Sequence, residues 1–381
     1  MHTMTSRERM LTAIQNGRPD RVPVAPDTSN MIPCRLTGKP FWDIYLYDDP
    51  PWWQAYINAA KHFKFDGWLY SVPIELPADQ AARESQPVWT EAIVERTPEV
   101  IYTRSHARID GVEQWSDRCN VYFIDNPPNC GVPLAKVGLA AGAPARWEDV
   151  QRRTEYHGAE ALRVARQMMG DDGVVALATW MPGLSIADPA SIYEYYDNHA
   201  AVVARCEAQR EDTLRRLPEL IALKPDLILV GASGHMIANP EPIFRELSLP
   251  TLKDVTAMCK AAGMPSQVHC CGPEHDLVRI AAEETDLCSI NPLEIPPMGD
   301  CELAELKRNF GSRLSLMGNL HTTDVMLRGT PEVVRRAARR AIDDAAAGGG
   351  FILSTGDQCG RDTPDENLYA LIETAHEYGR Y

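Results

Sequence analysis

The segment Asp226–Gly231 reads DLILVG, a short run of apolar residues that is uninterrupted between its two ends. Val174–Trp180 (VVALATW) and Phe351–Thr355 (FILST) have the same character. Short, nearly continuous apolar runs are typical of parallel strands that are covered on both faces. These segments therefore predict buried strands of a parallel sheet.

Five further segments bring the number of predicted strands to eight. They are Arg21–Pro26, Gly67–Val72, Ser266–Cys270, Leu287–Asn291 and Leu314–Gly318. Helical patterns separate most of the strands, at Ala55–Phe63, Ala159–Met169, Ser191–Leu217, Thr251–Ala262, Glu274–Glu284, Glu302–Phe310, Pro331–Ala347 and Asp365–Tyr378. This alternation predicts an α/β fold of the (β/α)₈ or TIM-barrel class.

Two regions do not follow the alternation. The first residues, Met1–Gly17, have a helical pattern and predict an N-terminal helical extension. The interval at about 75–172 contains alternating stretches, Ala92–Arg96 and Val100–Ala107, which predict a β-hairpin insertion. Since no repeat or flexible linker divides the chain, we expect residues 1–381 to form one barrel domain with this insertion.

Composition and charge exclude several classes of function. The 381 residues include 38 Lys and Arg against 53 Asp and Glu, so the net charge is −15. This disfavours nucleic acid and anionic membranes as partners, because both need a positive face. No stretch is apolar enough to span a bilayer, and no secretory signal pattern is present, which predicts a cytoplasmic protein. Ten cysteines are too sparse for a secreted disulfide framework.

The candidate site residues follow the predicted strands, because barrels of this class carry their functional groups at the carboxyl ends of the strands. In chain order these residues are Asp27, Trp180, Met181, Ser233, His235, His269, Cys271, Glu294, Asn319, His321, Asp357 and Cys359.

His269 and Cys271 lie two residues apart on one strand end, so their side chains project to the same face. Together with Cys359 after the last strand they would supply one imidazole and two thiolates. Three such ligands and one open position are typical of a catalytic zinc ion. The alternative is that both cysteines are small buried hydrophobic residues and that His269 donates to a carbonyl.

The other candidates have less specific roles. Glu294 is a catalytic acid or base, a fourth metal ligand or an ion-pair partner. His235 and His321 are candidates for catalysis or for substrate contact, with polar loop residues as the alternative, and Asp357 would orient a metal ligand. The remaining residues are expected to bind substrate: Asp27, Trp180, Met181, Ser233 and Asn319.

Tryptophan is concentrated in the early part of the chain, at Trp42, Trp52, Trp53 and Trp68. Packing in the core is the default interpretation of these side chains. The alternative is that they form an aromatic wall for a flat ligand.

Four stretches resemble one known family. They are Arg21–Pro26 (RVPVAP), Asn291–Asp300 (NPLEIPPMGD), Leu316–Pro331 (LMGNLHTTDVMLRGTP) and Gly348–Asn367 (GGGFILSTGDQCGRDTPDEN). Over nearly its full length the chain resembles the uroporphyrinogen decarboxylase superfamily. The decarboxylases of that superfamily carry an arginine-rich segment that holds substrate carboxylates, whereas this chain has Asp27–Gly38 (DTSNMIPCRLTG) there.

The sequence is more similar to the corrinoid-dependent methyltransferase branch. Members of that branch bind zinc through His-x-Cys and a distant cysteine, and His269, Cys271 and Cys359 match this pattern. The resemblance implies a cobalamin-type corrinoid carried by a separate corrinoid-binding protein, since no Asp-x-His-x-x-Gly motif is present here.

The resemblance implies transfer of a methyl group between a small methylated substrate and the cobalt of the corrinoid. O-demethylation of a methyl ether is favoured, and an aromatic ether would suit the tryptophan-rich region. The alternatives are a decarboxylase-like lyase and a non-enzymatic binding barrel. The sequence leaves the oligomeric state open, a homodimer included.

Overall fold

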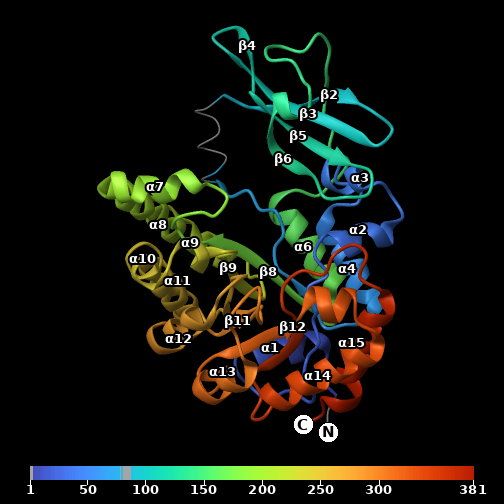
Figure 1. Cartoon of the computed structure of the whole chain (residues 1–381), viewed down its shortest axis with the longest axis vertical. Helices are drawn as coiled ribbons and strands as arrows, with labels where there is room; N and C mark the ends of the chain where they lie inside the picture. Colours follow the sequence, from blue (N-terminus) through green and yellow to red (C-terminus); the bar gives the residue numbers. More distant parts are fainter. Residues whose placement is uncertain (1–2, 78, 80–86) are drawn as a thin grey trace. The chain divides into compact units, whose positions relative to one another are not determined.

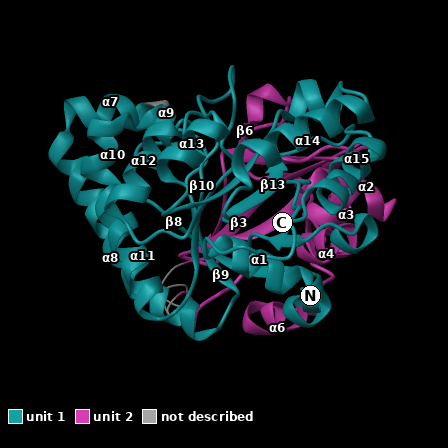
Figure 2. Ribbon diagram, turned by 90° about the horizontal axis from the view of Figure 1, so that it is seen from below, with its two compact units in different colours: residues 1–28, 60–72, 165–381 teal, residues 29–59, 73–164 magenta. Residues whose placement is uncertain are grey.

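The computed structural model of the chain describes residues 3–77, 79 and 87–381 (Figure 1). The chain forms two compact units, coloured separately in Figure 2. Unit 1 comprises residues 1–28, 60–72 and 165–381, and unit 2 comprises residues 29–59 and 73–164. Unit 2 therefore includes residues 29–59 as well as most of the predicted insertion. Residues 78 and 80–86 of that insertion lie outside the described part.

Unit 1 is built on a seven-stranded parallel sheet in the order β1-β8-β9-β10-β11-β12-β13. The strands are β1 (Gly67–Leu69), β8 (Gly173–Trp180), β9 (Leu227–Gly231), β10 (Ser266–His269), β11 (Ser289–Asn291), β12 (Ser315–Leu320) and β13 (Phe351–Thr355). Spatial order follows chain order, as in a barrel that winds in one direction. The predicted TIM-barrel class is confirmed.

The predicted first strand, Arg21–Pro26, pairs less regularly than the other seven. Val24 forms a single parallel bridge with Leu353, and its carbonyl accepts the N–H of Asp66, just before β1. Pro23 and Pro26 have no N–H to donate, which limits the ladder on this segment. The segment nevertheless lies between β13 and β1 and connects the two ends of the sheet.

Helices connect the strands of unit 1, and Figure 1 shows them in chain order from green to red around the sheet. They are α7 (Pro189–Asp197), α8 (His199–Ala222), α9 (His235–Ala238), α10 (Glu241–Leu247), α11 (Leu249–Ala261), α12 (His275–Glu284), α13 (Leu303–Phe310), α14 (Pro331–Ala345) and α15 (Asp365–Tyr378), with 3₁₀ turn η2 (Gly170–Asp172) and π-helical turn η3 (Thr322–Leu327). The single helix expected at Ser191–Leu217 is two helices, because Asn198 leaves the helical conformation at φ −143°.

The amino-terminal helix α1 (Ser6–Ile14) is packed against the sheet. A capping box starts it: Thr5 accepts the N–H of Glu8, and the Glu8 carboxylate accepts that of Thr5. Its apolar face, with Met10 and Ile14, belongs to one buried cluster with residues of β8, β9, β12 and β13. The N-terminal helical extension is therefore part of the barrel core.

Unit 2 contains an antiparallel sheet in the order β6-β5-β3-β2-β7, with β4 paired to β3. Its strands are β2 (Thr90–Arg96), β3 (Val100–Ile109), β4 (Val112–Trp115), β5 (Arg118–Phe123), β6 (Asn129–Pro133) and β7 (Glu148–Asp149). Helices α2 (Met31–Thr37) and α3 (Phe41–Tyr45) and 3₁₀ turn η1 (Leu134–Lys136) belong to the same unit, while α4 (Trp52–Phe63) and α6 (Gly158–Met169) cross the unit boundaries. The predicted hairpin is the β2–β3 pair of a larger sheet.

Two further expectations can be compared with the structure. In the described part, no helix is long and apolar enough to cross a bilayer. Trp53 and Trp68 are buried, and the Trp68 indole N–H donates to Gln267 at 2.7 Å inside the barrel. These two tryptophans therefore have the packing role that was the default interpretation.

Candidate active site

The carboxyl ends of β10 and β11 bring two polar side chains together. His269 and Asn291 are paired residues of adjacent parallel strands, and Asn291 Nδ2 lies 3.2 Å from His269 Nδ1. Asn291 Oδ1 is buried and has no hydrogen-bond partner in the described part of the chain. A half-turn of the amide would let Oδ1 accept an N–H from Nδ1, which leaves the Nε2 lone pair available for a ligand.

On its other side His269 faces Asp357, which follows β13. Nε2 of His269 lies 3.8 Å from Oδ1 of Asp357. Burial lowers the pKa of His269 and raises that of Asp357, while attraction between the two charged forms opposes both shifts. The imidazole is thus favoured in its neutral form, the form that binds metals.

Cys271 is half-buried on the same strand end. Its sulfur is hydrogen-bonded to the side chain of Ser233 and to the backbone of Gly234, in the loop after β9. Burial raises the pKa of the thiol, and the nearby carboxylate of Asp357 raises it further. Ser233 therefore lies where the sequence predicts a site residue, in contact with a candidate metal ligand.

Cys359 is fully buried after β13. Its backbone N–H donates to the Asp27 carbonyl at 2.8 Å, and its sulfur is hydrogen-bonded to Thr355 and Thr363. Burial, with a smaller effect of Asp27, raises the pKa of this thiol to about 12. In the structure Cys359 is held as a neutral thiol by its own loop.

The donor set has the chemistry of a zinc site but is not gathered into one. Among the described residues, no three His, Cys, Asp or Glu side chains lie close enough to hold a metal ion. The imidazole of His269, supported by Asn291, and the sulfur of Cys271 fit zinc as donors. The Cys359 sulfur would have to leave its threonine partners to join them, so the three-ligand set stays a prediction.

Glu294, after β11, lies near this group. Its Oε2 accepts the backbone N–H of Gly272 at 2.5 Å, and Gly272 adopts φ +96°, which a glycine tolerates without strain. Burial raises the pKa of Glu294; the Gly272 N–H opposes this, and the charge of Asp357 adds to it. Glu294 therefore keeps a proton more readily than an exposed carboxyl does.

A second carboxyl, Glu274, was not singled out from the sequence. It is completely buried, accepts the N–H of Leu293 through Oε2, and has no partner for Oε1 within the described residues. Burial raises the pKa of Glu274 well above its usual value, and the Leu293 N–H only partly offsets this. The only signal in the sequence was its position three residues after Cys271, which a helix start explains equally well.

The structure does not bring His235 into this group. Its Nε2 lies 2.7 Å from Ser248 Oγ. The Ser248 hydroxyl donates its proton to the Pro182 carbonyl, so the hydrogen bond with His235 is donated by the N–H of the ring to Ser248 Oγ. The ring also packs edge-on against Phe244, and burial lowers its pKa to about 4. His235 is a neutral residue of the interior.

His321 and Asn319 lie at the end of β12. His321 Nδ1 accepts the N–H groups of Thr323 and Asp324 at 3.2 and 3.0 Å, so it starts the π-helical turn η3. The neutral ring then carries its proton on Nε2. Asn319 is buried and donates from Nδ2 to the Leu293 carbonyl at 3.0 Å.

Trp180 ends β8 with 66 % of its surface exposed, whereas Met181 is buried. The Trp180 ring lies against Gly231, where an added Cβ would approach it to 2.4 Å. Other exposed apolar side chains lie in the segments that follow the strands, among them the short helix α9 and the turn η3; they are Ile186, Ile237, Met298 and Leu327. The carboxyl-terminal rim of the barrel thus exposes several hydrophobic side chains.

Comparison with known proteins agrees with the resemblance. The family model of uroporphyrinogen decarboxylase (URO-D) matches residues 206–378. A uroporphyrinogen decarboxylase of an Azoarcus species is 28 % identical over 203 residues, which is 46 % of this chain and 54 % of that protein. The enzyme of Ralstonia nicotianae is 34 % identical over 73 residues, which is 18 % of this chain and 20 % of the relative. The matches span about half or less of these relatives.

Among solved structures, a methyltransferase from Methanosarcina mazei superposes with a TM-score of 0.63. The alignment covers 98 % of this chain and 99 % of the other at 16 % identity, so it supports a common fold. Residues 206–378, a little less than half of the chain, match the uroporphyrinogen decarboxylase (URO-D) family model, in agreement with the superfamily that the sequence resembles.

Proposed function

We propose that this protein is a zinc-dependent methyltransferase that moves a methyl group between a small methylated substrate and the cobalt of a corrinoid held by a partner protein. The observation that carries the proposal is the pairing of His269 with Asn291 at the strand end that also bears Cys271. A histidine supported through one ring nitrogen, beside a half-buried thiol, is typical of metal-binding side chains.

His269, Cys271 and Cys359 would hold the metal, with Asn291 orienting the imidazole. When bound, zinc would supply a Lewis acid that stabilises negative charge on the oxygen of a methyl ether or on the sulfur of a thiol. We favour a methyl ether, and an aromatic one would suit the exposed indole of Trp180. The ligands do not decide the direction of transfer, so a thiol acceptor is the alternative.

The chain's own residues have distinct tasks in this proposal. Glu294, whose pKa is raised mainly by burial, gives its proton to the leaving oxygen. His321, with its proton on Nε2, is a second hydrogen-bond donor at the end of β12. Asp27, Met181, Ser233 and Asn319 lie at or beside the strand ends and limit the space for the substrate. Asp357 favours the protonated state of its neighbours by repelling a second negative charge.

The exposed apolar side chains of the rim support the proposal that a partner protein docks there. Ile186 and Ile237 lie beside Gly234 and Gly272, the glycines next to the candidate ligands, because an added Cβ there would approach them to 2.4 and 3.1 Å. The buried core of a protein interface is more apolar than its rim, and aromatic anchors such as Trp180 carry much of its affinity. We propose that the corrinoid protein docks on this rim and brings the cobalt over the site.

A decarboxylase-like reaction is the second candidate, because the curated relatives carry that name. Its substrate class has several carboxylates and needs cations to hold them. Asp27–Gly38 contains the single arginine Arg35, and the site itself is lined by Glu294, Asp357 and Glu274. This acidic lining favours the methyltransferase.

Metal analysis combined with a methyl-transfer assay tests the proposal. The purified protein should contain close to one zinc per chain, and Cys271→Ser should lose it without unfolding. Cob(I)alamin should be methylated in the presence of a methyl ether, with methylamines and thiols as the comparison panel. Metal-free protein that still transfers methyl groups, or decarboxylates porphyrinogens, would contradict the proposal; activity on thiols alone would reverse its direction.

A further inference from the structure

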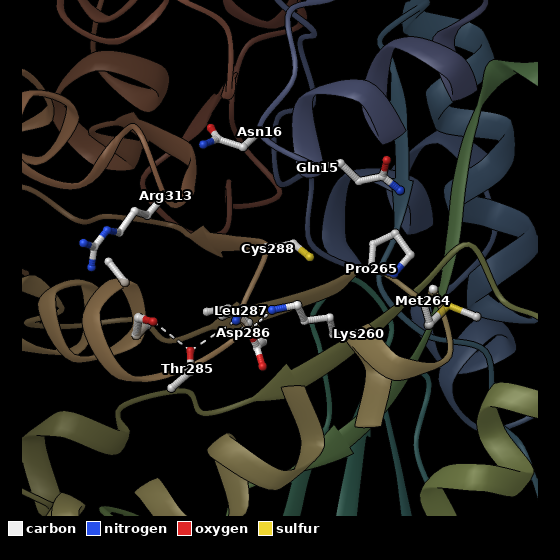
Figure 3. A pocket seen from close by; sticks show the side chains of 13 residues that line it. Gln15, Asn16, Lys260, Met264, Pro265, Thr285, Asp286, Leu287, Cys288 and Arg313 are labelled. Atoms are coloured by element: carbon white, nitrogen blue, oxygen red, sulfur yellow. Dashed lines mark hydrogen bonds and ion pairs between the residues drawn. The ribbon is translucent and has the colours of Figure 1, made fainter. Parts of the chain in front are cut away.

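A pocket of about 520 Å³ lies at the opposite end of the barrel strands (Figure 3). It is lined where chain segments enter β10, β11 and β12, by Pro265, Cys288 and Arg313 among others, and by Gln15 after α1. The candidate active site lies at the carboxyl ends of β10 and β11, so the pocket is separate from it. Its volume is within the range of small-molecule sites, about 300–1,000 Å³.

The charges around the pocket favour an anion. The guanidinium of Arg313 is exposed and has no ion-pair or hydrogen-bond partner among the residues that the structure describes. Lys260 is the second cation and pairs with Asp286, the only carboxylate among the lining residues. Two cations and one carboxylate leave a net positive charge here, on a chain whose total charge is −15.

Cation binding is less favourable in the same place. Helices α11 and α12 end beside the pocket, and helix ends of this polarity attract cations. However, the last carbonyls are satisfied: Cys259 accepts the N–H of Met264 at 2.9 Å, and Ala281 accepts the hydroxyl of Thr285 at 2.7 Å. Since Asp286 is occupied by Lys260, the free charge that remains is the guanidinium of Arg313.

The rest of the lining is apolar. Figure 3 shows Arg313 on one side and Met264 and Pro265 on the other, with Leu287 and Cys288 between them. Ala281 and Ala282 add short side chains that leave space. A ligand that fills this pocket therefore carries its charge at one end and an apolar body beyond it.

We infer that this pocket binds a small organic acid whose carboxylate pairs with Arg313 and whose aromatic or branched body packs on Met264, Pro265 and Leu287. A guanidinium fork binds a carboxylate through two parallel hydrogen bonds, which gives geometric selectivity as well as affinity. The amide of Gln15, at the edge of the pocket, is available to a polar substituent.

The pocket adjoins the start of a strand whose other end carries a candidate ligand. Ser266 begins β10 at the pocket, and His269 ends the same four-residue strand at the candidate site. Asn16, also in the lining, binds the Gly311 carbonyl at 3.2 Å and thus fixes the end of α1 against the segment that carries Arg313. A bound acid would therefore contact the segments that hold the start of β10 in place.

Calorimetric titration of the full chain with benzoate tests the inference. We expect saturable binding of one benzoate per chain, at least tenfold weaker binding in Arg313→Gln, and an intermediate affinity in Arg313→Lys, which keeps the charge but not the fork. Arg340→Gln, an exposed arginine of α14, is the matched control and should bind as the unmodified chain does.

Two further ligands and one variant test whether benzoate binds in this pocket through its carboxylate and its apolar body. Benzamide, the neutral isostere, should bind at least tenfold more weakly, and inorganic phosphate should not replace benzoate, because it has no apolar body. His269→Ala should bind benzoate unchanged, which separates this pocket from the candidate active site. Equal binding of benzamide or phosphate, unchanged binding in Arg313→Gln, or loss of binding in His269→Ala would each overturn the inference.

Discussion

Asn291 and His269 meet across two adjacent parallel strands, with 3.2 Å between the amide nitrogen of one and Nδ1 of the other. Partners of this kind fix the ring orientation and the tautomer of a metal-binding histidine. Asn291 is buried and its oxygen has no partner in the part of the chain described, so nothing else there holds the amide in one orientation.

Replacement of Asn291 by alanine should therefore weaken zinc binding by about 10- to 100-fold, the usual effect of losing such a partner. Asn291→Asp should keep the affinity, because a carboxylate accepts the Nδ1–H at least as well. Competition with a chelator of known affinity measures both constants. Equal affinities for all three proteins would show that Asn291 does not orient a ligand.

Gly272 should be intolerant of a side chain for two reasons. It adopts φ +96°, and an added Cβ would lie 3.1 Å from Ile237. Gly272→Ala should lower the free energy of unfolding by about 1–3 kcal/mol and disturb the N–H that binds Glu294. Gly170→Ala is the control, since Gly170 has φ +56° and open space around it. The control should lose about 1 kcal/mol of unfolding free energy, as measured by urea unfolding. It should keep its full activity, as measured by methyl transfer.

The pH dependence of stability should show the contribution of His106 in unit 2. This imidazole lies between Glu113 and Asp149 and stacks on Trp115 with 4.6 Å between ring centroids. Burial lowers its pKa, but the hydrogen bonds to the two carboxylates raise it more, and the net direction is upward. Its contribution is therefore complete below the unfolded pKa of about 6.5 and disappears as pH rises through the folded pKa.

His106→Gln should accordingly cost more stability at pH 6 than at pH 9. The difference should not exceed about 1 kcal/mol, because the pairs are partly exposed. Urea unfolding of both proteins at the two pH values measures it. A cost that is the same at pH 6 and pH 9 would mean that the ion pairs do not contribute.

The buried ion pairs of Arg9 should contribute more to the free energy of unfolding than those of His106 do. Arg9 contacts Asp20 and Asp66 at 2.7 Å each, and the Asp66 side chain is completely buried. Arg9→Leu should lower the free energy of unfolding by about 3 kcal/mol, the lower end for a broken buried pair, because Arg21 still holds Asp66. Arg163→Ala removes an exposed pair with Glu160 and should leave the free energy of unfolding nearly unchanged.

Trp180 should contribute to the partner interface and not to stability. Since 66 % of its surface is exposed, Trp180→Ala should leave the unfolding midpoint nearly unchanged. If the corrinoid protein docks on the rim, the same change should weaken that complex at least tenfold, as a buried aromatic anchor would. Tyr193→Ala, which removes a similarly exposed aromatic side chain from α7, is the control for a general surface effect. Parallel losses in both variants would refute the assignment of the rim.

The barrel strands could be predicted because they are short apolar runs covered on both faces. Predicted and observed bounds agree within about two residues for β8, β9 and β13. The break at Asn198 could not be predicted, since the helical pattern continues across it. The segment with Pro23 and Pro26 was predicted as a strand from its apolar character, but prolines restrict its hydrogen bonding.

The candidate site was predicted in part, because strand ends locate residues but not the directions of their side chains. His269 and Cys271 share an environment with Glu294 and Asp357, as their positions indicated. His235 also follows a strand, yet it turns inward to Ser248, a contact thirteen residues away that spacing does not reveal. Spacing likewise does not reveal the hydrogen bonds of Thr355 and Thr363 to the Cys359 sulfur.

The bridge between Val24 and Leu353 joins two segments that are far apart in the sequence. In the same region the Gly350 N–H donates a hydrogen bond to the Gly17 carbonyl. On a ribosome, the segment around Val24 emerges long before β13 has been translated. The nascent chain therefore keeps the segment around Val24 without its partner until β13 has been translated. A chain that ended before Phe351 would lack β13 and would leave Val24 without its bridge.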